Sequence, residues 1–126
     1  MVESYLLVFL GAGLGGALRH GVNRAADAWL GSGFPFGTLF VNVAGSLAMG
    51  VLAVLFLART GTDQHLRLFL TTGLLGGFTT FSAFSLEAAL MVQRNDYAAL
   101  AFYAGGSVLL SILALFAGFH VVRTLS

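Results

Sequence analysis

Four apolar stretches, each long enough to cross a membrane, constrain this 126-residue chain more than any other feature. The hydrocarbon core of a bilayer is about 30 Å thick, which a helix of roughly 20 residues spans. Backbone groups in lipid must bond within their own segment, so such stretches form helices. The sequence therefore predicts a single all-α membrane domain over residues 1–126, with spans at about 4–20, 36–58, 66–93 and 98–122 and a first loop at 23–34.

The composition argues against most other classes of protein. Hydrophobic residues make up 58% of the chain and charged residues 9%, well below the roughly 25% of a soluble domain. Without cysteine the chain forms neither a disulfide nor a thiolate metal site, and its three histidines are far apart. A formal net charge of +1 gives no field for nucleic acid. Because Glu3 stands where a signal peptide is basic, the first stretch is expected to be retained as a span.

The arginines divide evenly between the two sides of the membrane. With four spans, one side holds Arg59, Arg67 and Arg123, and the other holds Arg19, Arg24 and Arg94. Because neither side carries an excess of positive charge, the positive-inside rule favours neither orientation, and the chain is expected to insert in both. Two copies can pair antiparallel about a two-fold axis in the membrane plane. A fixed orientation set by other features is the alternative.

The third span is the least regular of the four. Gly76–Gly77 followed by Thr79–Thr80 makes a poor continuous helix, since each glycine costs roughly 1 kcal/mol relative to alanine. Broken backbone survives in a membrane only where it is buried or lines a polar cavity. The first half of a broken span ends in free carbonyls, and two antiparallel copies would gather them into a cage that suits Na⁺. Tight glycine packing without an ion is the alternative, and spacing alone favours it.

Polar side chains within the spans are typical either of helix–helix contacts or of an ion path. Asn42 offers uncharged amide donors, with Thr38 one turn earlier on the same face. A hydroxyl recurs at every fourth position of the last span, at Tyr103, Ser107 and Ser111. These hydroxyls form one stripe, unless each bonds back to its own helix.

Phenylalanines and two charges complete the candidate set. Phe78, Phe81 and Phe84 recur at every third position, which usually indicates core or lipid contact. The positive edge of an aromatic ring can also solvate an anion weakly, as a conduit requires. Arg19 is expected to reach the interface and draw anions into a vestibule. Glu87 either lies at a pore mouth or pairs with an arginine.

Three motifs stand out in the sequence: GAGLGGALRH at 11–20, GTLFVNVAGS at 37–46 and TTGLLGGFTTFSAFSLE at 71–87. Together they resemble the Fluc (CrcB) family of fluoride channels. The resemblance covers the whole chain, including its length, spans and charge balance. It implies an antiparallel dual-topology homodimer in the bacterial inner membrane. It also implies two fluoride pathways at the subunit interface and a structural Na⁺ on the two-fold axis.

The resemblance also implies roles for individual residues. The Na⁺ would be held by backbone carbonyls of Gly76 and Thr79 from both subunits. Arg19 would lie in a vestibule and Glu87 near the pore end. Leu115 stands where some relatives carry a further hydroxyl. The fluoride pathway would take Asn42, Phe81, Phe84, Thr38, Tyr103, Ser107 and Ser111.

The implied activity is passive export of cytoplasmic fluoride. A negative-inside potential of 100 mV is worth about 2.3 kcal/mol per charge, so no energy-coupling motif is required. A small multidrug-type proton-coupled exporter is one alternative, although it needs a carboxylate deep in the bundle, usually in the first span. A packing subunit of a larger complex is another, although it would not explain the aligned asparagine, phenylalanines and hydroxyls.

Overall fold

The computed structural model describes residues 1–58 and 63–125, and within these ranges the regular elements are helices. Four helical units are long and apolar enough to cross a membrane, at Val2–Leu30, Phe36–Leu57, Gln64–Gln93 and Tyr97–Leu125. The four expected spans are therefore confirmed. The elements are α1 (Val2–Leu30), α2 (Phe36–Ala58), α3 (Gln64–Arg67), the π-helical η1 (Leu68–Leu75), α4 (Gly76–Phe78), α5 (Phe81–Gln93) and α6 (Tyr97–Leu125).

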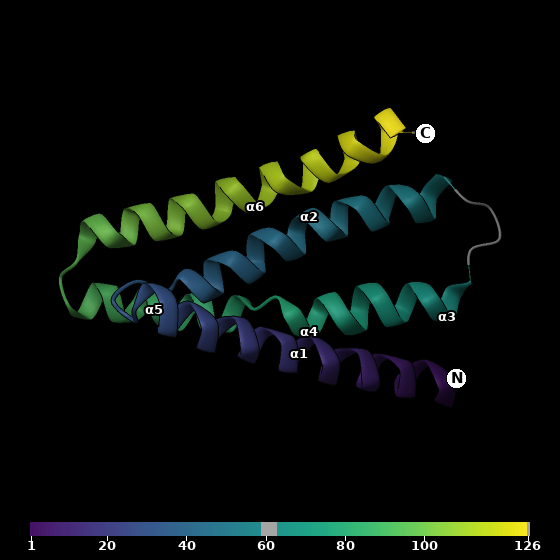
Figure 1. The fold of residues 1–126 in the computed structure, drawn as a ribbon, viewed down its shortest axis with the longest axis horizontal. Coiled ribbons are helices and arrows are strands. Elements are labelled where there is room, and N and C mark those ends of the chain that lie inside the picture. The colour runs from purple at the N-terminus through teal and green to yellow at the C-terminus, as the bar shows by residue number, and fades with distance from the viewer. Residues whose placement is uncertain (59–62, 126) are drawn as a thin grey trace.

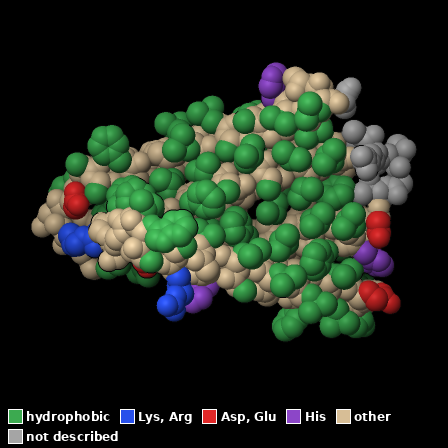
Figure 2. Space-filling model, viewed as in Figure 1, with side chains coloured by type: hydrophobic (Ala, Val, Ile, Leu, Met, Phe, Trp, Pro, Cys, Tyr) green, Lys and Arg blue, Asp and Glu red, His purple; other side chains and the backbone are tan. Residues whose placement is uncertain are grey.

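The helices lie side by side in an elongated bundle, with both chain ends at the same end of it (Figure 1). This arrangement is what an even number of crossings requires. The most extensive contact joins α2 to α6, while α1 packs mainly against η1 and α4. One face is covered largely by hydrophobic side chains, with charged groups mostly toward its two ends (Figure 2). Such a surface suits a bilayer.

The first helix extends further than the sequence indicated. A loop was expected from residue 23, but α1 continues to Leu30, so that expectation is wrong. The segment from 23 to 30 contains three alanines, which have the highest helix propensity. Gly31, at a φ of 79°, then ends the helix, and its amide donates to the Asp27 carbonyl.

Glycines allow the first and third spans to approach at backbone distance. A Cβ atom added to Gly11 would lie 2.6 Å from the Phe69 carbonyl oxygen, and one added to Gly15 would overlap the Leu74 carbonyl. Gly77 meets the Ala12 backbone in the same way. Close packing, one of the two interpretations of the glycine pair, is therefore confirmed for Gly77. Gly76 has no such contact, because its nearest neighbour, the Thr71 carbonyl oxygen, is 3.7 Å away.

The third span is broken near its middle, as expected, although not at its glycine pair. Gly76 keeps helical angles, whereas Thr79 and Thr80 have extended backbones, with φ/ψ of −88°/158° and −154°/117°. Thr80 caps the helix that follows, since its hydroxyl accepts from the Ala83 amide at 3.2 Å. Phe78 ends α4 and Phe81 begins α5, so the three phenylalanines that recur at every third position do not share one continuous helix.

Candidate functional site

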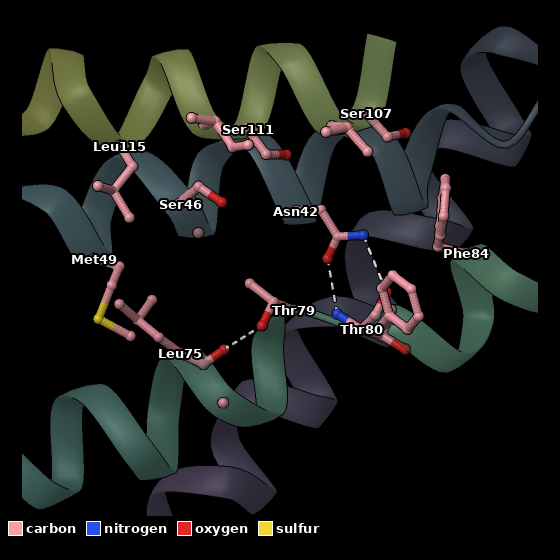
Figure 3. Close-up of a pocket in the computed structure, with 15 residues that line it drawn as sticks. Asn42, Ser46, Met49, Leu75, Thr79, Thr80, Phe84, Ser107, Ser111 and Leu115 are labelled. Carbon is pink, nitrogen blue, oxygen red and sulfur yellow. Dashed lines mark hydrogen bonds between the residues drawn. The ribbon is translucent and has the colours of Figure 1, made fainter. Parts of the chain in front are cut away.

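A cavity of about 420 Å³ lies between α2, α6 and the break in the third span. Figure 3 shows side chains from all three directions turned toward it. Its described lining contains no charged residue. The residues singled out from the sequence that line it are Asn42, Gly76, Thr79, Phe81, Phe84, Ser107 and Ser111.

Asn42 holds the broken segment to α2 through two hydrogen bonds. Its Nδ2 donates to the Thr80 carbonyl at 3.0 Å, and the Thr80 amide donates to its Oδ1 at 2.7 Å (Figure 3). Because a backbone N–H only donates, this pairing fixes which amide atom faces Thr80. The interpretation of Asn42 as glue between helices is confirmed. One of the two Nδ2 hydrogens is used in this pairing, so the amide keeps a second donor.

The same pairing removes the usual hydrogen-bond donors from two backbone carbonyls at the break. In a continuous helix the Thr80 amide would donate to the Gly76 carbonyl, and the Ala83 amide would donate to that of Thr79. Here those two amides donate to Asn42 and to the Thr80 hydroxyl instead. Gly76 and Thr79 thus lose the donors a continuous helix would give them. The Leu75 carbonyl, by contrast, accepts from both the amide and the hydroxyl of Thr79, at 3.0 and 2.9 Å.

Two serines of α6 present free hydroxyls to the cavity. Ser107 is 7% exposed, and its Oγ has no hydrogen-bond partner in the described chain. Ser111 lies one turn further along the same wall, also without a partner there. Other hydroxyls do bond back to their own helix, as Thr71 does to Arg67 and Ser85 to Phe81. The back-bonding alternative is therefore wrong for these two serines.

Glu87 lies beside the cavity lining, in a cluster of its own. The Tyr103 hydroxyl donates to its Oε1 at 2.9 Å, and the Thr38 hydroxyl donates to its Oε2 at 3.2 Å. Both hydroxyl residues are buried. Neither is part of the cavity wall, so the structure separates them from Ser107 and Ser111. Within residues 1–58 and 63–125, the ion pairs do not include Glu87, which leaves its pairing with an arginine unsupported.

Arg19 lies at the break. Its Nε donates to the Gly77 carbonyl at 3.1 Å in a half-buried contact. The guanidinium therefore stands at the end of the first half of the third span, where the helix dipole is negative. This contact joins the side chain to the third span, which the sequence did not indicate. The expected place of Arg19 in a vestibule at the interface stays a prediction.

Phe81 and Phe84 differ in their surroundings. Phe81 is 77% exposed on the outside of the bundle, although it also borders the cavity. The Phe84 ring lies 5.5 Å from that of Phe81 and 5.1 Å from that of Tyr103, centroid to centroid. The rings thus form a row from the surface into the protein.

Ser46 is a further residue of the cavity wall that the sequence patterns above did not single out. It lines the cavity one turn after Asn42 on α2. The four-residue spacing from Thr38 through Asn42 is the signal that extends to it.

A helical bundle with four membrane-spanning units and an uncharged polar cavity at a broken helix is typical of membrane transport proteins. Residues 6–119 match the model of the CrcB-like protein, Camphor Resistance (CrcB) family. The chain belongs to this family and is a multi-pass bacterial membrane protein, as the resemblance in its motifs indicated.

Several curated relatives carry the name fluoride-specific ion channel FluC. That of Methylobacterium nodulans (strain LMG 21967 / CNCM I-2342 / ORS 2060) is 60% identical over 118 residues, which is 94% of each chain. That of Granulibacter bethesdensis is 55% identical over 122 residues, 97% of this chain and 96% of the relative. That of Rhodopseudomonas palustris (strain BisB5) is 52% identical over 123 residues, 98% and 99% of the two chains. These relatives are ion channels and not enzymes.

Proposed function

We propose that this chain is a fluoride channel that lets cytoplasmic fluoride leave passively down its electrochemical gradient. The observation that carries the proposal is the uncharged polar wall of the cavity. Ser107 and Ser111 lie there beside Asn42, and the two serine hydroxyls have no protein partner in the described chain. A small, strongly hydrated anion needs replacement donors, but a fixed positive charge would hold it too tightly to leave. The relatives, which are named fluoride-specific ion channels, support the same ion.

A second copy of the chain completes this pathway in our proposal. Phe81 is largely exposed, and Ser82 beside it is an exposed hydroxyl within a membrane span. An exposed polar group is costly against lipid, so a protein partner is the favoured neighbour. The balanced arginines support antiparallel pairing, since neither orientation is preferred. Two-fold symmetry would then give two pathways per dimer, one for each copy of the cavity.

The carbonyls of Gly76 and Thr79 fit the structural Na⁺ that the family resemblance implies. Both lose their helical donors at the break, as described above. Carbonyl oxygens of unwound membrane backbone are suitable ligands for this cation. The same two carbonyls from an antiparallel partner would complete the set. A bound Na⁺ would neutralise the negative ends of the two half-helices and join the two copies.

Fluoride release from liposomes tests the function. Purified protein is reconstituted in vesicles loaded with potassium fluoride, and valinomycin then sets an inside-negative potential. We expect fluoride to appear outside, at an electrode, at once and without a pH gradient. Protein-free vesicles, and vesicles loaded with potassium chloride, serve as controls. Release that requires an added pH gradient would indicate an exchanger, and no release at all would refute the channel.

A further inference from the structure

We infer that Ser46 carries the fluoride path beyond Ser111, so that the path passes from α6 to α2 at that point. This inference rests on the proposed function and assigns one more residue to it. Ser46 lines the cavity, and its hydroxyl is turned toward it in Figure 3. In residues 1–58 and 63–125 that hydroxyl has no hydrogen-bond partner, neither its own helix nor a neighbouring one.

On α6, Ser111 is the last hydrogen-bond donor of the cavity wall. The next residue on this face of the helix is Leu115, which also lines the cavity. Met49 of α2 borders the same end, and Figure 3 shows these two apolar side chains at the end away from Phe84. An anion leaving Ser111 in this direction would lose its hydroxyl donors on α6. Ser46 stands between Asn42 and this apolar end, and it supplies the missing hydroxyl.

The polar row on α2 leads to the same residue. Thr38, Asn42 and Ser46 follow one another at four-residue spacing. The Thr38 hydroxyl donates its only hydrogen to Glu87, and Asn42 uses both ends of its amide on Thr80. Ser46 is therefore the member of this row whose donor is entirely free for a ligand.

Close packing keeps the two polar rows at a fixed separation. Gly50, one turn beyond Ser46, lies against the backbone of Leu115, and Gly118 lies against the backbone near Val51. Neither position has space for a Cβ atom, so α2 and α6 cannot slide apart there without losing this contact. The hydroxyls of Ser46 and Ser111 are thus held on two walls of one cavity.

Single-channel recording in planar bilayers tests the inference with three variants. Ser46→Ala removes the donor, and the loss of one hydrogen bond to the passing ion should lower the fluoride current roughly threefold to tenfold. Adding Leu115→Thr to Ser46→Ala returns a hydroxyl to the same end of the cavity and should restore much of the current. Ser85→Ala is the matched control, since that hydroxyl is spent on its own helix, and its current should equal that of the wild type.

The outcomes separate this inference from the proposed function. A wild-type protein without fluoride current would refute the channel itself. A wild-type current that Ser46→Ala leaves unchanged would overturn only the role of Ser46. A reduced current that Leu115→Thr does not restore would overturn it as well, because the loss would then come from altered packing. Gel filtration of each variant, with an unchanged elution volume, shows that the assembly survives the substitution.

Discussion

Replacing Asn42 with alanine tests whether the break in the third span depends on a single side chain. The substitution removes two hydrogen bonds, at 3.0 and 2.7 Å, and strands the amide and carbonyl of Thr80. A polar group left without a partner costs about 1–3 kcal/mol. The adjoining polar cavity can hold a water that recovers part of this loss. We therefore expect Asn42→Ala to lower the free energy of unfolding by about 2–4 kcal/mol.

The assay is reversible unfolding in mixed micelles, titrated with a denaturing detergent and followed by helical circular dichroism. Ser111→Ala is the control in the same cavity, because its hydroxyl has no partner in the described chain. It should change the unfolding free energy by less than about 0.5 kcal/mol while lowering fluoride current. Asn42→Ala should lower both. An unfolding free energy for Asn42→Ala that equals the wild-type value would show that the break is held by other contacts.

Three further predictions concern the ring row, the topology and the helix contact. Phe81→Ile should suppress fluoride release from liposomes while its elution volume on gel filtration stays that of the wild type; unchanged release would remove this ring from the pathway. The chain has no native cysteine, so a single cysteine at the C-terminus should react with an impermeant reagent from both sides of the membrane; reaction from one side alone would refute dual topology. Gly15→Ala should destabilise the fold by about 1–3 kcal/mol, because its Cβ overlaps the Leu74 carbonyl. Gly16→Ala, which meets no atom within 4 Å, should not do so in the same unfolding assay.

The spans could be predicted because each depends on the hydropathy of a local window, which needs no tertiary information. The break was predictable in kind but not in position. Glycine propensity pointed to Gly76–Gly77, yet both remain helical because Gly77 packs against Ala12. The chain leaves the helix at Thr79 and Thr80 instead. An amide of another helix holds Thr80 there, and no local pattern records that contact.

The candidate site shows the same limit for individual side chains. The four-residue spacing predicted that Tyr103, Ser107 and Ser111 lie on one face of a helix, and all three do lie on α6. It could not show that a carboxylate sixteen residues earlier in the chain engages Tyr103. Nor could it show that Arg19 donates to a carbonyl of the third span that lies 58 residues later in the sequence.

A hydroxyl serves a passing anion only if its hydrogen is not already committed, and this condition divides the predicted polar track in two. Thr38 and Tyr103 donate to Glu87, so their hydroxyls can bind an anion only after their hydrogen bonds to the carboxylate break. Ser107 and Ser111 have no such competitor in the described chain. A single hydroxyl has one hydrogen, and a carboxylate holds it more strongly than a neutral acceptor does. In the proposed channel, the serines of the cavity wall are therefore where fluoride would exchange water for protein donors without first breaking a hydrogen bond of the fold.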